Sequence, residues 1–372
     1  MKKVGLVTWL GGGNFGSCLQ SYALYKKIIS LGYECYFIPT FDYRNLGLKA
    51  SFKYFLISIG VKKIYTVLFK KKKIVPKNLQ KTQDVQKKVY KIFHVETKSH
   101  YKKLLSLIDI FCVGSDQVWN AYHSYSPFMF LDFANSKKRI SYASSMGTND
   151  FPEEYKKDIK KYLSRFSYIS LRESDGCEAV KNLTGRSDVK NVLDPTFLLT
   201  KEDWIQFSSD AVLEFELPER YILCYLIGKN ECYIQQIENI RNHSGIEDII
   251  IIPADENKDF ICPNAKIYKF AGMKEFVALI SKASLVITDS FHATALSINL
   301  NTCFVEFLRF SNSDIKSQNS RIYNLLDIFG LKHRLFDSSD YATLAINYSQ
   351  VNLILEKYRS LSLKYLEDAL SK

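Results

Sequence analysis

Long apolar runs are absent from this chain of 372 residues. No uninterrupted apolar stretch reaches the roughly 20 residues that a transmembrane helix needs. The N-terminal stretch Lys2–Leu10 imitates a secretion signal, but its apolar part is short and three glycines follow before any cleavage point. We interpret it as a buried first strand that leads into a glycine loop. The sequence therefore predicts that the protein stays in the cytoplasm.

Patterns of metal-binding residues are also missing. The six histidines form no His-Glu-x-x-His motif, and neither Asp-x-Asp nor Cys-x-x-Cys occurs among the acids and the eight cysteines. Four cysteines lie in apolar runs: Cys35, Cys112, Cys224 and Cys303. Single cysteines in apolar runs behave as small buried residues, which favours a reducing compartment. The sequence predicts no metal site of the familiar kinds.

What is present is a globular composition with an excess of positive charge. Apolar residues make up 47% and charged residues 24% of the chain, as in ordinary globular domains. A chain of this length can form two domains that each have a core. The net charge of +12 predicts attraction to polyanions such as phosphorylated substrates or acidic lipid headgroups.

Much of this charge is concentrated between Lys62 and Lys81, where aromatic and aliphatic residues separate the lysines. That mixture suits a helix lying on the anionic inner face of the cell membrane, as a peripheral contact. The alternative is a solvated basic insertion that spans about residues 45–100. No nucleic-acid-binding module accompanies the lysines, so we expect no nucleic-acid partner.

Apolar strands alternate with helical segments in both halves of the chain. The first half begins with a strand at Lys3–Trp9, a helix at Ser17–Leu31 and a strand near Glu34–Ile38. Strands of the second half are expected at Tyr221–Ile227, Asp248–Ile252, Leu285–Thr288 and Cys303–Phe307. This alternation is typical of parallel sheets covered by helices.

We therefore predict an α/β fold with two doubly wound, Rossmann-like domains that face a cleft. The first domain is expected over residues 1–200, with the basic insertion inside it, and the second over residues 218–345. Helical spacing in the tail predicts a C-terminal helix over residues 346–372. The cleft between the domains is the expected ligand site.

The loop Gly11–Gly16 follows the first strand and matches Gly-x-Gly-x-x-Gly. A dinucleotide site also requires an acid at the end of the second strand, and this chain has none at that place. The loop can still bring backbone N–H groups close to a phosphate or carboxylate, with Asn14, Gly16 and Ser17 as binding residues. The alternative is a tight strand-to-helix turn without a ligand.

Polar residues follow two further strands of the first half. A strand at Leu107–Val113 leads to Ser115 and Asp116, and a short strand at Tyr168–Leu171 leads to Arg172. An arginine at the end of a strand can hold a phosphate or carboxylate through two parallel N–H bonds. The alternative is a salt bridge between Arg172 and its neighbour Glu173 or another acid.

The strand Leu285–Thr288 is followed by Asp289, Ser290 and, after Phe291, by His292 and a helical run. Ligands of open α/β sheets bind beyond the carboxyl ends of strands. A histidine at that place, which titrates near neutrality, can act as acid or base, and Asp289 can orient it. The alternative is structural, with Asp289 capping the helix and His292 filling its first turn.

Together, these segments resemble the polysaccharide pyruvyl transferase family. The matching motifs appear in family order and cover most of residues 1–335. They are Gly13-Asn14-Phe15-Gly16-Ser17, Val113–Asn120, Ser141–Ser145, Leu171-Arg172-Glu173, Leu193-Asp194-Pro195-Thr196, Asp289–His292 and Ser320-Arg321-Ile322. The basic segment and the C-terminal tail lie outside the resemblance.

The resemblance implies a fold like that of the GT-B glycosyltransferases, with phosphoenolpyruvate as donor substrate and no further cofactor. The implied acceptor is a sugar of a cell-surface polysaccharide or of its lipid-linked or nucleotide-linked precursor, which receives pyruvate as a cyclic ketal. The family's histidine falls on His292 and its strand-end arginine on Arg172.

Two departures from the family pattern affect the expected site. Several members have arginine where this chain has Ser290, which predicts that Arg309 or Arg321 supplies the missing positive charge for substrate binding. Glycine is common where this chain has Ala293, which narrows the space beside the histidine.

Two other classes of function remain open at the level of the sequence. A nucleotide-sugar-dependent glycosyltransferase of GT-B type would use the same cleft but would not release phosphate from phosphoenolpyruvate. A non-catalytic glycan-binding or membrane-binding module would tolerate changes at His292 and Arg172. Polar and ionisable residues gather at several strand ends, which favours an enzyme.

Overall fold

The computed structural model describes residues 1–46, 76–255, 257–310, 318–336 and 345–371. Most of the predicted membrane contact, Lys62–Lys81, lies outside these residues. Lys77 and Lys81 are described, and they belong to helix α4 (Lys77–Val89).

The first domain is built on a parallel sheet with the strand order β2-β1-β3-β4. These strands are β1 (Lys3–Val7), β2 (Glu34–Phe37), β3 (Ile110–Val113) and β4 (Lys138–Ser141). Isolated bridges from Ile140 to Tyr168 and from Ser144 to Leu171 connect the segment of β4 to that of β5 (Ser170–Leu171), which pairs in parallel with β6 (Lys190–Asn191). After β1, the chain places β2 on one side of β1 and then β3 on the other side. The switch point of this sheet therefore lies between β1 and β3.

Helix α1 (Phe15–Ser30) directly follows the glycine loop. It begins where it does because the side chain of Asn14 accepts a hydrogen bond from the Ser17 N–H at 3.1 Å. The other described helices of this domain are α4, α5 (Lys98–Leu107), α6 (Ala121–Ser124), α7 (Glu153–Leu163) and α8 (Ser174–Thr184), with short 3₁₀ turns at Pro127–Phe130, Asp132–Ala134 and Pro195–Phe197.

The second domain contains a parallel sheet with the order β11-β10-β7-β8-β9. Its strands are β7 (Tyr221–Tyr225), β8 (Asp248–Ile251), β9 (Lys266–Ile267), β10 (Leu285–Thr288) and β11 (Phe304–Glu306). Its helices are α9 (Lys201–Ser208), α10 (Tyr233–Ser244), α11 (Met273–Lys282), α12 (Phe291–Leu300) and α13 (Asn319–Ile328), and a 3₁₀ turn lies at Lys332–Arg334. The switch point of this sheet lies between β7 and β10. The predicted fold of two doubly wound domains is confirmed.

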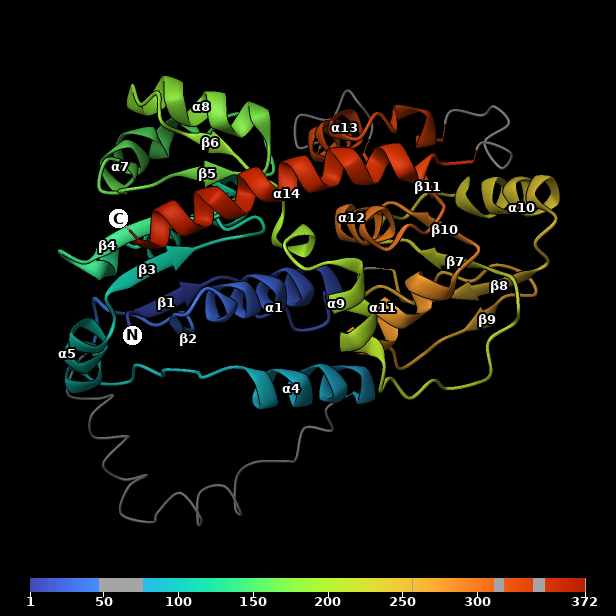
Figure 1. Cartoon of the computed structure of the whole chain (residues 1–372), viewed down its shortest axis with the longest axis horizontal. Helices are drawn as coiled ribbons and strands as arrows, with labels where there is room; N and C mark the ends of the chain where they lie inside the picture. The colour runs from blue at the N-terminus through green and yellow to red at the C-terminus, as the bar shows by residue number, and fades with distance from the viewer. Residues whose placement is uncertain (47–75, 256, 311–317, 337–344, 372) are drawn as a thin grey trace, which may run out of the picture.

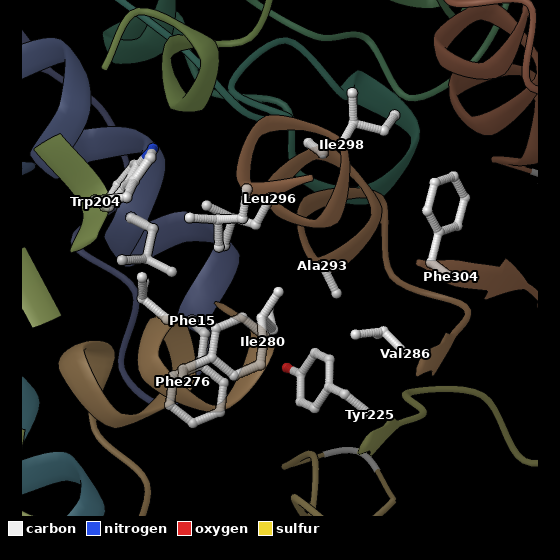
Figure 2. Packing of buried hydrophobic residues seen from close by; sticks show 14 of the residues in the cluster. Phe15, Trp204, Tyr225, Phe276, Ile280, Val286, Ala293, Leu296, Ile298 and Phe304 are labelled. Carbon is white, nitrogen blue, oxygen red and sulfur yellow. The ribbon is translucent and has the colours of Figure 1, made fainter. Parts of the chain in front are cut away.

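Helix α1 of the first domain packs directly on the second domain. Phe15 stacks on Phe276 of α11 with ring centroids 4.5 Å apart, and it meets Tyr225 of β7 edge to face (Figure 2). Leu296 of α12 belongs to the same buried cluster. The start of α1 is therefore fixed beside the start of α12, where the sequence predicts the site.

Helix α14 (Tyr348–Ser371) crosses both domains, as Figure 1 shows. The first half of α14 packs Val351 and Leu355 into the hydrophobic cluster that includes the second-domain sheet. Its last turns place Leu366 in one of the two hydrophobic clusters of the first domain. Between them, Arg359 donates from Nε to the Phe197 carbonyl at 2.6 Å and from Nη2 to Asn299 Oδ1 at 2.9 Å. Across the described parts of the chain, no helix combines the length and the apolar character required to cross a bilayer.

Candidate active site

A cavity of about 490 Å³ opens between the two domains. It lies beyond the carboxyl ends of β1 and β3 on one side and of β7 and β10 on the other, so the switch points of both sheets border it. Its lining includes seven of the residues predicted from the sequence: Asn14, Ser17, Asp116, Ser290, His292, Arg309 and Arg321.

His292 lies in the first turn of α12, and its side chain is 9% exposed. Its Nε2 lies 3.3 Å from Arg172 Nη1 and 3.6 Å from Asp194 Oδ2. The ring packs closely against α1, because a Cβ added to Gly16 would stand 2.1 Å from His292 Nδ1. The imidazole therefore sits at the junction of the two domains, against polar groups of the first.

Arg172 is almost fully buried, with its side chain 1% exposed, and does not line the cavity. It donates to Glu173 Oε1 at 3.0 Å, to Asp194 Oδ2 at 2.9 Å and to Asp116 Oδ1 at 3.3 Å. Its positive charge is thus balanced by three carboxylates, including the Glu173 partner that the sequence left open. In this arrangement Arg172 positions Asp116, Asp194 and His292, and its guanidinium has no free N–H pair with which to bind an anion.

Two of the acids around Arg172, Asp116 and Asp194, remain ionised although they are buried. Burial alone would raise the pKa of Asp194, but the contacts with His292 and Arg172 outweigh this effect and hold it below its ordinary value. Burial likewise opposes ionisation of Asp116, and the charges of Arg172 and His292 lower its pKa overall.

Asp289 does not have either of the two roles that its sequence position suggested. Its Oδ1 accepts from the Ile227 N–H, and its Oδ2 accepts from the Gly228 N–H, both at 2.7 Å. Oδ2 also accepts from the Tyr233 hydroxyl at 3.0 Å. The N-cap of α12 is Ser290, and the carboxylate beside His292 is that of Asp194. Asp289 fixes the loop after β7, because β7 and β10 are adjacent strands.

Asp194 lies beside Arg172 and His292, and the site predicted from the sequence does not include it. It belongs to a motif of the family resemblance and follows the short strand β6, so a carboxylate at a strand end was the available signal. The proline after Asp194 is typical of a turn that leaves the sheet. In the structure its Oδ1 caps this turn by accepting from the Thr196 N–H at 3.0 Å, while Oδ2 faces Arg172 and His292.

Arg309 and Arg321 supply the positive charge on the second-domain side of the cavity. Arg309 donates from Nη2 to the Asp289 carbonyl at 3.1 Å, and its Nε lies 3.7 Å from Asp289 Oδ2. Arg321 donates from Nη2 to Gln318 Oε1 at 2.6 Å, and its Nε finds no hydrogen-bond partner among the described residues. Burial and the charge of Arg172 lower the pKa of Arg321, although a guanidinium still keeps its proton at neutral pH.

Two helices of the second domain begin at the cavity. The N-cap residues of α12 and α13 are Ser290 and Gln318, and both line the cavity. Neither helix has a capping side-chain hydrogen bond or an acidic residue in its first turn. Their N–H groups and positive dipole ends therefore add to the charge of the two arginines.

The start of α1 is different because an acid already lies against it. Ser17 Oγ donates to Asp116 Oδ2 at 2.5 Å, and the N–H of Ser17 is occupied by the Asn14 side chain. Ser115, a predicted binding residue, is fully buried behind the cavity. Its hydroxyl lies 2.8 Å from the Ala143 carbonyl and 3.0 Å from Asp194 Oδ2, so Ser115 supports the site instead of lining it.

A second cavity, of about 750 Å³, lies between α1, α4, α9 and α11. Two of the four lysines that line it are paired with acids, since Lys81 Nζ donates to Glu275 at 2.8 Å and Lys274 Nζ donates to Asp210 at 2.5 Å. No strand of either sheet ends there with polar side chains in the way that β1, β3, β7 and β10 do at the interdomain cavity. We therefore place the site in the interdomain cavity. Within the described residues, no three His, Cys, Asp or Glu side chains are grouped to hold a metal ion.

Three solved structures are similar to this chain, and the two with TM-scores above 0.5 support the fold. The UDP-GlcNAc 2-epimerase from Neisseria meningitidis, solved with UDP-GlcNAc bound, is 11% identical and has a TM-score of 0.52 over 100% of this chain and 99% of its own. A protein from Listeria monocytogenes described as a UDP-N-acetylglucosamine 2-epimerase is 12% identical, with a TM-score of 0.51 and 97% of both chains covered. MurG from Acinetobacter baumannii is 10% identical, with a TM-score of 0.42 and 99% of both chains covered.

No curated protein matches this sequence significantly. A family model does match it, over residues 14–312, and its description is polysaccharide pyruvyl transferase. The match begins at the N-cap of α1 and extends past β11, so it includes residues from both walls of the interdomain cavity, whereas Trp9, Gln318 and Arg321 lie outside it. The chain belongs to the polysaccharide pyruvyl transferase family.

Proposed function

We propose that the protein transfers a pyruvyl group from phosphoenolpyruvate to a sugar of a cell-surface polysaccharide or of its lipid-linked precursor. The product is a pyruvate ketal that bridges two hydroxyls of the sugar. Membership of the family supports a transferase of this kind. The observation that carries the donor assignment is the cavity in which Arg309, Arg321 and two helix N-termini surround an imidazole.

Phosphoenolpyruvate carries a phosphate and a carboxylate on a three-carbon unit, so its site needs several fixed positive groups. Arg309 and Arg321 meet this need, and Arg321 has no carboxylate partner of its own among the described residues. Guanidinium groups bind phosphate and carboxylate oxygens through paired N–H bonds. The N–H groups at the start of α12 can bind a further oxygen.

The reaction balances without an external reductant or oxidant. A proton adds to the methylene carbon of the donor, which becomes the ketal methyl group, and a sugar hydroxyl oxygen forms a bond to the adjacent carbon. The bond from that carbon to the phosphate oxygen then breaks, and the second hydroxyl takes its place. Two hydroxyl protons are released, of which one replaces the proton delivered to the methyl group and the other leaves with inorganic phosphate.

His292 is the group we assign to proton transfer. It lines the cavity, and a well-placed acid or base typically contributes about 10²–10⁴ in rate. Asp194 lies beside Nε2, and Arg172 holds Asp194, so these two residues fix the ring without contacting the donor. In this proposal Asp289 contributes through the loop after β7, not through His292.

The test is turnover of phosphoenolpyruvate with a panel of free and lipid-linked galactosides, glucosides and mannosides. We expect phosphate release that depends on the acceptor, and a new ketal methyl signal in the proton NMR spectrum of the product. Phosphate release that is absent with every acceptor, together with transfer from a nucleotide sugar, would instead identify a GT-B glycosyltransferase.

Substitution of the histidine tests its role. His292→Ala should lower turnover by at least about 10²-fold while the thermal unfolding of the protein stays unchanged. His243→Ala, at an exposed position of α10, is the matched control and should retain activity. Near-normal turnover in His292→Ala would remove His292 from the chemistry.

A further inference from the structure

The two walls of the interdomain cavity differ in charge. Arg309 and Arg321 stand on the second-domain wall, together with the starts of α12 and α13. Among the described residues that line the first-domain wall there is no lysine or arginine, and there is one acid, Asp116. An anionic donor is therefore attracted to one wall and repelled by the other.

We propose that the first-domain wall, built around Trp9, is the acceptor subsite and binds an uncharged sugar ring. This inference rests on the proposed function for the identity of the reaction. It predicts a sugar-binding surface with a defined chemistry, and binding to this surface can be measured without turnover.

Trp9 supplies the flat apolar surface that a sugar needs. Trp9 lies two residues after the end of β1 and lines the cavity. It is partly buried and packs against the first-domain cluster that includes Val7 and Val113. An indole ring is rigid, so it loses little conformational freedom when a ligand packs on it. The C–H groups on one face of a pyranose can pack on such a ring while the hydroxyls at its edge point outward.

The residues beside Trp9 supply neutral hydrogen-bonding groups. The side chains of His123 and Ser124 are exposed and line the cavity, and Gln117 lines it as well. Gln117 Nε2 donates to Gln318 Oε1 at 2.8 Å, and Gln318 Oε1 also accepts from Arg321, so one bond connects the two walls. Hydroxyl, amide and imidazole groups around an aromatic ring match the alternating donors and acceptors of a sugar edge.

His292 lies where the two walls meet. It belongs to α12 of the second domain, yet its ring rests on Gly16 of α1 in the first domain. A sugar on the Trp9 wall and a donor on the arginine wall would both reach this imidazole. The arrangement therefore gives each substrate its own wall and places the proton-transfer group between them.

The experiment measures the binding of each substrate separately with the full chain. Saturation-transfer NMR with methyl galactoside, glucoside and mannoside reports sugar binding in the absence of phosphoenolpyruvate, and calorimetry without sugar reports phosphoenolpyruvate binding. Trp9→Ala should weaken the sugar signal by roughly three- to tenfold, the range expected for loss of one aromatic contact, and leave the affinity for phosphoenolpyruvate within about twofold. Trp9→Phe should restore most of the sugar signal.

Tyr122→Ala is the matched control, because Tyr122 is a neighbouring aromatic residue that is 54% exposed and does not line the cavity. It should change neither signal. The subsite is overturned if wild-type protein shows no sugar signal, or if folded Trp9→Ala or Trp9→Phe loses phosphoenolpyruvate affinity as strongly as sugar affinity. If wild-type protein fails to bind phosphoenolpyruvate but binds sugar through Trp9, the proposed donor is wrong and the subsite stands.

Discussion

At the scale of single residues, two buried arginines of the site, Arg172 and Arg321, have opposite surroundings. Arg172 is held by three carboxylates, whereas Arg321 donates to a neutral glutamine and leaves Nε without a partner among the described residues. A buried charge without a counter-ion is unfavourable until an anion arrives. Arg321 is therefore suited to bind a ligand, and Arg172 to hold the protein groups around it.

The sequence was sufficient to predict that His292, Arg309 and Arg321 line one cavity, because each lies just beyond a strand or at a helix start. It was not sufficient to predict their partners. Asp289 bonds to the amides of Ile227 and Gly228 because β7 is the neighbour of β10, and no local pattern encodes that neighbour. The same holds for Asp194, which is almost a hundred positions away from His292 along the chain.

Glu306, at the end of β11, is a fully buried acid whose Oε1 has no partner in the described structure. Its other oxygen contacts the Thr294 hydroxyl. Burial raises the pKa of Glu306 well above its ordinary value, so the folded protein keeps a proton that the unfolded chain releases above about pH 4.3. Because the folded state then binds more protons than the unfolded state, stability falls as pH rises from that value toward the folded pKa.

Glu306→Gln removes this titration and preserves the shape of the side chain. We expect the variant to gain stability relative to the wild type as pH rises from 5 to 8, with a slope of up to about 1.4 kcal/mol per pH unit. Urea unfolding at both pH values measures the difference. Glu219→Gln, at an exposed position, should show no such gain. A difference between Glu306→Gln and wild type that is independent of pH would mean that Glu306 is ionised when folded.

At the scale of helices and strands, local patterns predicted the elements well. The strand Leu285–Thr288 has the predicted bounds, and the first strand starts as predicted but ends at Val7, two residues early. Trp9 leaves the sheet there and lines the cavity instead. The order of the strands, and with it the two switch points, depends on contacts between distant segments and could not be predicted from the alternation alone.

The close approach of α1 to α12 gives an element-scale prediction. A Cβ at Gly16 would meet three atoms of His292 within 2.9 Å, so Gly16→Ala has to displace the imidazole or separate the helices. We expect turnover to fall by at least about tenfold, since small displacements of a catalytic group can reduce rates by up to about a hundredfold. Steady-state assays measure this loss.

Gly12→Ala is the control for this substitution. It lies in the same glycine loop, and a Cβ there would meet no atom within 4 Å. Its activity should match that of the wild type. Equal activity of Gly16→Ala and Gly12→Ala would show that the contact between α1 and the ring of His292 is not needed for turnover.

At the scale of the whole molecule, the two sheets meet through α1, α12 and the buried cluster around Phe15 and Phe276, and α14 spans both (Figures 1 and 2). The sequence predicted two domains and a final helix, because the alternation of strands and helices appears twice. It left open whether this helix would pack against one domain or both, because the spacing of apolar residues in a helix does not indicate which surface they cover.

Arg359 of α14 provides the test of this joint. Its guanidinium binds the Phe197 carbonyl and Asn299, and Asn299 in turn donates to the Thr196 and Leu199 carbonyls at 2.8 and 2.9 Å. Arg359→Ala leaves buried acceptors without a donor and should lower the free energy of unfolding by about 2–3 kcal/mol.

Urea unfolding followed by fluorescence measures this change. Lys357→Ala, at an exposed position of the same helix, is the control and should change the free energy of unfolding by less than about 0.5 kcal/mol. A similar small change in Arg359→Ala would show that the buried hydrogen bonds of Arg359 add little to the joint.

Helix α14 also limits how the cavity can exchange its contents. One end is anchored in each domain, and Arg359 ties its middle to the segment that connects them. A wide swing of one domain away from the other would have to bend 24 residues of continuous helix or break these bonds. Because the helix resists bending, we expect small molecules to enter and leave through the existing opening of the cavity, without a wide separation of the two domains.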